Sequence, residues 1–134
     1  MSTLKVTTIQ TSAGGPVTLT KQSANKSRIN YDMTGTPAAR DSFNHSSITD
    51  NATGDGSLNF TNNFSAATYA FAGASCVNDS TNDSNIGIIG PRRVTDTGIT
   101  TAFARIHHIF NSAGATTSLF DTGVNGMMFD GDLA

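Results

Sequence analysis

The side chains that titrate near neutral pH are three histidines, a residue type that also binds metal ions. In a strand, the adjacent His107 and His108 would point to opposite faces, so they cannot chelate one ion together. His45 has no cysteine or acid beside it at ligand spacing. We therefore expect ordinary strand histidines, with no metal and no cofactor in one chain. The alternative is a homotrimer in which one inward histidine from each chain meets on the axis.

Aspartates are the second group with possible chemistry, because all ten acidic residues are aspartates and calcium binds oxygen ligands. The loops Asp50–Asp55 and Asp79–Asp83 each hold two of them. Both lack the spacing and the final glutamate of an EF-hand, and Asn, Asp and Gly are common in exposed turns, so we interpret both as turns. The single cysteine, Cys76, has no partner for a disulfide. We expect it to be a small buried residue in a strand.

The residue types give little support for catalysis. The chain has no glutamate, few histidines, and no G-x-S-x-G, H-E-x-x-H or phosphate-binding motif. Serine and threonine are so abundant that no single one stands out as a nucleophile. We therefore predict that the protein is not an enzyme.

Several short stretches alternate apolar and polar residues, as half-buried strands do. The clearest is Arg28–Met33, in which every second residue is apolar. The turn-rich loop Asp50–Gly56 precedes the alternating Leu58 and Phe60, which predicts a hairpin. These patterns indicate strands that bury one face against a core.

Other predicted strands carry expectations about their faces. Phe43 and Ile48 lie five positions apart, so placing both on one face needs a bulge or a bend. In Tyr69–Ala74, aromatic residues alternate with alanines, which suggests that the second face is tightly covered. The remaining predictions are a strand at Ile86–Ile89, a strand rather than a helix over Ile99–Phe110, and a strand pair over Leu119–Phe129.

The chain divides into an arm and a body. Residues 1–26 contain a short strand-like stretch, the turn Gly14–Pro16 and a polar linker, and we predict an N-terminal attachment arm. Residues 27–134 hold the other predicted strands. Short strands at this spacing predict an all-β body, either an antiparallel β-sandwich or a jelly-roll-like knob.

Composition limits the partners. Only 13% of residues are charged, the net charge is −2, and the basic residues are scattered, so we expect no nucleic-acid partner. No apolar run is long enough to span a membrane and the N-terminus has no leader pattern, so we expect no membrane insertion and synthesis in the cytoplasm. Large apolar residues are few, which predicts a thin core completed by copies of the chain and a monomer that is unstable alone.

The stretch from Ala38 to Ser75 contains a series of motifs that resemble those of known proteins. The motifs are Arg40–Asn44, Ser46–Asp50, Gly54-Asp55, Asn59–Thr61 and Tyr69, and the ends MSTLKVTTIQ and MMFDGDLA add to them. Together they resemble phage virion proteins, namely tail fibres and tail-fibre-like proteins of marine and cyanobacterial podoviruses. The chain departs from that pattern at Arg28–Tyr31, where the family has a Trp-containing strand, and at Gly56, where a tyrosine is common.

The resemblance implies a homotrimeric or otherwise oligomeric virion component with a β-sandwich body. Its arm would attach it to the particle, with Leu4, Val6 and Ile9 as the attachment residues. The implied partners are further copies of the chain, other virion proteins of the tail or capsid, and the host surface. The implied location is the virion, after synthesis in the host cytoplasm. The first hypothesis is therefore a short tail-fibre-like or tail-associated bacteriophage protein that contacts the host.

Two alternatives stay open. The first is a capsid decoration or head-fibre protein, fixed to the major capsid protein by residues around Leu4–Ile9. The second is a lectin-like module that binds a host-surface glycan. It ranks lowest, because sugar sites usually use exposed aromatic residues and the chain has two tyrosines and no tryptophan. The residues considered for sugar or other host contact are Asp79, Asn82, Asp83, Asn85 and Tyr69.

Overall fold

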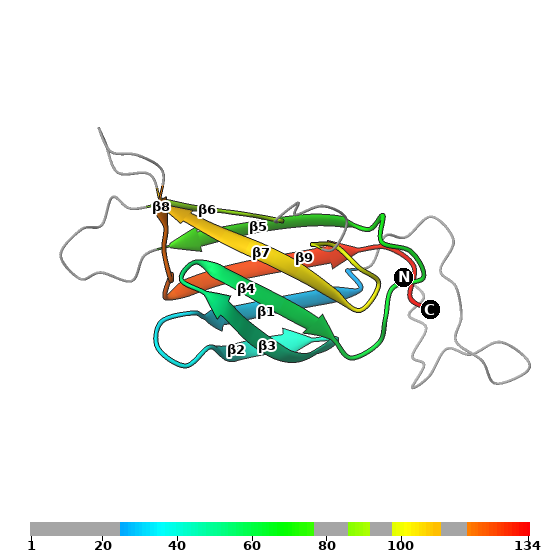
Figure 1. Cartoon of the computed structure of the whole chain (residues 1–134). Helices are drawn as coiled ribbons and strands as arrows, with labels where there is room; N and C mark the ends of the chain where they lie inside the picture. The colour runs from blue at the N-terminus through cyan, green and yellow to red at the C-terminus, as the bar shows by residue number, and fades with distance from the viewer. Residues whose placement is uncertain (1–24, 77–85, 92–97, 111–117) are drawn as a thin grey trace, which may run out of the picture.

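The computed structural model describes residues 25–76, 86–91, 98–110 and 118–134. Every regular element within these ranges is a β-strand, so the all-β prediction is confirmed (Figure 1). This composition favours strands, because β-branched and aromatic residues pack well on a pleated surface while Asn, Asp and Gly close turns. The strands are β1 (Ser27–Asp32), β2 (Ala38–Phe43), β3 (His45–Ala52), β4 (Asp55–Phe60), β5 (Ala70–Cys76), β6 (Ile86–Pro91), β7 (Phe103–Phe110), β8 (Ser118–Leu119) and β9 (Val124–Asp130).

The strands form one antiparallel sheet in the order β2-β1-β9-β5-β6-β7-β4-β3, and β8 pairs with β7. The sheet folds over itself, so that β4 and β7 cross in front of β1 and β9 in Figure 1. We call β2, β1, β9 and β5 the first half-sheet, and β6, β7, β4 and β3 the second half-sheet. Their facing sides enclose the core, and the sheet is nearly closed into a barrel-like shape.

The two half-sheets meet at two corners. At one corner, the described residues of β5 and β6 pair through Ser75 with Gly87 and Cys76 with Ile86. At the other corner, Asn44 joins β2 to β3 with a φ of 61°, a conformation that asparagine tolerates better than most residues. The predicted bend therefore lies at Asn44. The expectation that Phe43 anchors the core is wrong, because its side chain lies on the outer side and is 53% exposed.

The core confirms the alternation expected in Arg28–Met33. Ile29, Tyr31 and Met33 are buried, and the residues between them face outward. The second half-sheet contributes Leu58 and Ile106 to the core, and both side chains are fully buried. Fully burying a large apolar side chain contributes about 1.5–3 kcal/mol, so these positions dominate the stability of the body.

An aromatic cluster fills one end of the core. The ring centroids of Phe60 and Phe64 lie 4.8 Å apart, and those of Phe64 and Tyr69 lie 4.5 Å apart. Phe129 of β9 completes the cluster from the first half-sheet, 5.2 Å from Phe60. The pairs of Phe60 with Phe64 and with Phe129 are edge to face, an arrangement that adds about 0.5–1.5 kcal/mol per pair beyond burial. The cluster thus joins the half-sheets where β5 begins.

The outer side of β5 is not tightly covered, contrary to what the sequence led us to expect. The alanines expected to be tightly covered are exposed, because no described element lies over that side of the strand. Cys76, expected to be buried, is also exposed. Its neighbour across the ladder is Val124 of β9, itself partly exposed. The outer side of β5 is therefore an open surface.

The segment Ile99–Phe110 is a strand rather than a helix, as predicted, but β7 begins only at Phe103. Before it, the Thr100 hydroxyl accepts hydrogen bonds from the backbone N–H groups of Ala102 and Phe103, which closes a tight turn. Ile99 then forms an isolated bridge with Ala104. A local side-chain to backbone hydrogen bond therefore makes the strand start later than the apolar pattern suggested.

The predicted hairpin is the β3–β4 pair, turned at Thr53-Gly54. Gly54 has a φ of 67°, and a Cβ at this position would lie 2.5 Å from the backbone nitrogen of Phe120. Its N–H donates to Asp121 Oδ1 at 2.7 Å, and its carbonyl accepts from the His108 N–H at 2.9 Å. The turn is thus fixed against the loop after β8, and only glycine fits it without strain.

Candidate functional site

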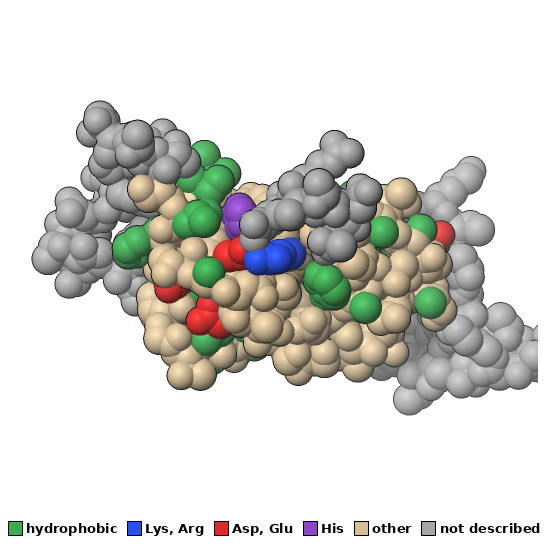
Figure 2. Space-filling model, in the orientation of Figure 1, with side chains coloured by type: hydrophobic (Ala, Val, Ile, Leu, Met, Phe, Trp, Pro, Cys, Tyr) green, Lys and Arg blue, Asp and Glu red, His purple; other side chains and the backbone are tan. Residues whose placement is uncertain are grey.

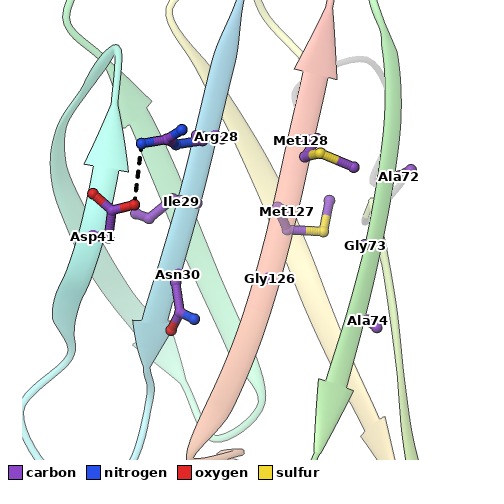
Figure 3. Close-up of a pocket in the computed structure, with 10 residues that line it drawn as sticks. All are labelled: Arg28, Ile29, Asn30, Asp41, Ala72, Gly73, Ala74, Gly126, Met127 and Met128. Carbon is purple, nitrogen blue, oxygen red and sulfur yellow. Dashed lines mark hydrogen bonds and ion pairs between the residues drawn. The ribbon is translucent and has the colours of Figure 1, made fainter. Parts of the chain in front are cut away.

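The outer side of the first half-sheet is the surface best suited to binding. Alternation along β1 and β9 points Arg28 and Asn30 outward beside Met128 and Gly126. On the other side of β9, Met128 pairs with Ala72 and Gly126 pairs with Ala74. Figure 3 shows these side chains on three neighbouring strands. Small residues thus occupy the middle of an exposed sheet face.

The small residues leave a hollow of about 500 Å³ on this face. A Cβ at Gly126 would meet no atom within 4 Å, so the space above β9 is open rather than filled by a neighbouring side chain. We call this hollow the trough. Its defining residues are Arg28, Asn30, Ala72, Ala74, Gly126 and Met128.

The charges at the rim of the trough are neutralised in pairs. An amino group of Arg28 lies 3.2 Å from Oδ2 of Asp41, as the dashed line in Figure 3 marks. Nearby, Arg40 lies 2.8 Å from Asp32. The pKa of Asp32 is lowered, first by the hydrogen bond from the Thr34 hydroxyl and further by the Thr34 N–H and the Arg40 charge. Because each of these arginines is paired with an aspartate, the rim is polar but close to neutral. Exposed pairs of this kind contribute little to stability.

The trough is an apolar surface without its own cover in the described chain. Met128, at its edge, is 54% exposed, and Val124 further along β9 is 38% exposed. Contiguous exposed apolar surface of this kind usually marks a place where another molecule packs. The arrangement favours contact by shape and apolar burial rather than bond-making chemistry.

A second hollow, of about 310 Å³, continues the trough toward the start of the described chain. The two hollows share Ala72 and Met128. Asn25, the first described residue, lines the second hollow together with Phe71 and Asp130. Asn25, where the described part of the chain begins, therefore lies beside this surface.

The opposite side of the molecule carries a cluster of charged groups that the sequence did not indicate. Asp55 is only 3% exposed and accepts hydrogen bonds from Nε and an amino group of Arg105, both at 2.7 Å. Nε2 of His107 lies 3.4 Å from Oδ2 of the same carboxylate. Figure 2 shows acidic, basic and histidine side chains gathered on this face. The hydrogen bonds that Arg105 donates to this carboxylate raise the pKa of its guanidinium.

This cluster pins β4 to β7 rather than forming a catalytic set. The nearby Ser57 hydroxyl accepts a hydrogen bond from Asn51 Nδ2 at 2.9 Å, so it is held by an amide and not by a general base. Asn51 Nδ2 also lies 3.3 Å from Asp55 Oδ1. Sequence analysis missed the cluster because Asp55 and Arg105 are far apart in the chain. It interpreted Asp55 only as a turn residue, although Asp55 is the first residue of β4.

The two other histidines lie inside the molecule, as the strand interpretation expected. His108 Nε2 lies 2.7 Å from the Tyr31 hydroxyl, and His45 Nε2 lies 2.8 Å from the Ser27 hydroxyl. His107, next to His108, points to the outer side, which confirms that the neighbours face opposite ways. Burial lowers the pKa of His45 and of His108 to about 4. Both side chains are therefore neutral at pH 7.

The residues proposed from sequence for binding fall in different parts of the chain. Tyr69 is buried in the aromatic cluster with 7% exposure, so its expected contact with sugar is wrong. Within the described ranges, no group of three or more metal-binding side chains comes together. The other proposed residues lie outside the described residues: Leu4, Val6 and Ile9 of the arm, and Asp79, Asn82, Asp83 and Asn85 of the loop after β5.

Comparison with protein-family models, with curated proteins and with solved structures finds no match to this chain. In the part of the chain that the structure describes, no helix is long and apolar enough to cross a membrane. The features that bear on function are therefore the trough, the described side chains and the sequence motifs.

Proposed function

We propose that the chain is a non-enzymatic structural subunit of a bacteriophage particle, a short tail-fibre-like or tail-associated component that works as an oligomer. Its body supplies a rigid β-structure, and its arm anchors it in the particle. The role in the virion rests on the motifs between Arg40 and Tyr69, which resemble tail-fibre-like proteins.

The observation that carries the proposal is the trough. A chain with few large apolar residues nevertheless exposes Met128 and a row of small residues on one side of a well-ordered sheet. Alanine and glycine on a sheet face let a second layer approach closely, as facing sheets do at about 10 Å. Such a surface suits a subunit that packs against neighbours in an assembly.

The polar clusters agree with a structural role. Asp55 and Arg105 join β4 to β7, and the His108 side chain forms a hydrogen bond with Tyr31 in the core. These groups are engaged with one another rather than presented to a substrate. The body is thus built to hold its shape while its outer face and its arm make contacts.

The direct test is location. Antibodies against the purified body, carrying gold particles, should label intact phage particles at the tail, and mass spectrometry of washed particles should find the chain at a fixed copy number. Label on the head would instead favour the decoration or head-fibre alternative. Absence of the chain from washed particles would overturn the proposal.

The oligomeric state is the second test. Light scattering behind size exclusion should give a mass that is a whole multiple of the chain, with a trimer as the expected value. Dilution should dissociate and unfold the protein together, because a thin core loses its support when copies separate. A stable, fully folded monomer at all concentrations would contradict the assembly role.

A further inference from the structure

We propose that the trough is the docking site for an N-terminal segment, Leu4–Ile9, donated by a second copy of the chain. The inference rests on the proposed assembly role and names the partner that the arm binds. It assigns an acceptor surface in the body to residues that the sequence analysis identified only as attachment residues.

The first argument is where the arm leaves the body. Asn25 lines the second hollow, which shares Ala72 and Met128 with the trough, so an arm from either copy can enter along a continuous surface. Residues 10–24 separate the segment from that point, and they can span up to about 50 Å when extended. A segment that docked on its own body, close to Asn25, would not need a spacer of this length. The spacer is long enough to reach the body of a neighbouring copy.

The second argument is the shape of the segment and of the surface. In Leu4–Ile9, Leu4 and Val6 alternate with Lys5 and Thr7, so an extended segment presents two apolar side chains on one side. The trough offers a mostly apolar lining with free space above Gly126 and exposed alanines of β5. Apolar side chains about two residues apart can therefore fill the space that β9 leaves open.

The third argument is charge. All three lysines of the chain lie within residues 1–26, and that stretch has no acidic residue. The body holds all ten aspartates against five arginines, so arm and body carry opposite net charge. At the surface itself Asp41 is paired with Arg28, so the attraction comes from the net charge of the body, to which Asp130 in the second hollow contributes. Attraction over this range speeds and orients docking, and salt weakens it.

The acceptor side is tested by filling the trough. In Gly126→Gln the new Cβ meets no atom within 4 Å and the rest of the side chain can extend into the open trough, so the variant should fold and yet block the segment. The matched control is Gly90→Gln in β6, where a Cβ also meets nothing within 4 Å. We expect Gly126→Gln to lose at least half of its oligomer by light scattering at a concentration where wild type is assembled, with an unchanged circular dichroism spectrum. Gly90→Gln should assemble like wild type.

The donor side is tested by cysteine cross-linking in a Cys76→Ser background, which removes the exposed native thiol. One chain carries Val6→Cys and the other Ala74→Cys. Mild oxidation of the mixture should give a disulfide-linked pair of unlike chains, because a disulfide forms only when the two Cα atoms come within about 7 Å. Each variant oxidised alone should give far less linked product.

The outcomes separate this inference from the function on which it rests. A double variant that carries both cysteines and forms only an internal disulfide would overturn donation by a second copy. No disulfide in either arrangement, with wild-type assembly left intact by Gly126→Gln, would overturn docking in the trough while the structural role stands. A wild-type protein that is monomeric and absent from particles would overturn both.

Discussion

The hydroxyl of Tyr31 lies 2.7 Å from Nε2 of His108, so one buried hydrogen bond joins β1 to β7 across the core. The two rings meet edge to face, with centroids 5.6 Å apart. Both side chains are fully buried. Burial raises the pKa of the Tyr31 hydroxyl well above its usual value, so it stays protonated in the folded protein. A polar link therefore joins the two half-sheets inside the core, near the buried Asn125 side chain, which donates to the Tyr31 carbonyl.

Tyr31→Phe should lower the free energy of unfolding by about 1–3 kcal/mol, because Nε2 of His108 loses its partner in a place without water. Urea unfolding at a fixed protein concentration measures the change. The matched control is Tyr69→Phe, whose hydroxyl donates a longer hydrogen bond of 3.3 Å to the Phe103 carbonyl. The control should lose clearly less stability, and equal losses would argue against a special role for the bond between Tyr31 and His108.

Stability should fall as the pH falls from about 6.5 to 4. Burial lowers the pKa of His45 and His108 to about 4, whereas an unfolded histidine titrates near 6.5. In that window the unfolded chain binds protons that the folded chain does not, so protonation favours unfolding. The loss should reach roughly 2–3 kcal/mol per histidine once partial exposure is allowed for. Around His108, Asp121 and Asp55 oppose the shift slightly and His107 adds to it.

Unfolding midpoints in urea between pH 7 and pH 4 measure this dependence. The double variant His45→Gln and His108→Gln should show a flatter profile over the same window, whatever its stability at pH 7. His107→Gln is the control on the outer side of β7 and should keep most of the wild-type slope. A wild-type protein equally stable at pH 7 and pH 4 would show that the buried histidines do not control acid unfolding.

Arg105→Met should lower the melting temperature, because the buried carboxylate of Asp55 loses the two 2.7 Å hydrogen bonds from Arg105. Adding Asp55→Asn removes the buried charge itself, so the double variant should be more stable than Arg105→Met alone. Calorimetry of the four proteins in this cycle gives the coupling between the two side chains. Additive effects would mean that the pair does not act as a unit.

Two glycines separate backbone strain from steric conflict. Gly35 and Gly54 both have a φ near 67–68°, but a Cβ at Gly35 would meet nothing within 4 Å, whereas one at Gly54 would approach the Phe120 nitrogen. Gly35→Ala should therefore cost about 1 kcal/mol from strain alone. Gly54→Ala should cost clearly more, because the loop after β8 must move. Equal losses in urea unfolding would show that the loop yields without a penalty.

Local patterns predicted the strands well where one face is buried, as in β1, because alternation is a property of consecutive residues. They failed for β5, since the exposure of its alanines depends on whether another layer covers the strand. The pairs Tyr31 with His108 and Asp55 with Arg105 join residues 77 and 50 positions apart, so no local pattern contains them. The trough could not be predicted for the same reason. It exists only where β1, β9 and β5 come together.

The corner between β5 and β6 has a consequence for motion. In the part of the chain that the structure describes, two residue pairs connect these strands, whereas β5 pairs with β9 at seven positions. Opening the described part of this corner breaks few hydrogen bonds and leaves the ladders on either side intact. Amide protons there should exchange with solvent through brief local openings, and those in the centre of β9 should exchange only when the whole body unfolds. We therefore expect this corner to open locally before the body unfolds as a whole.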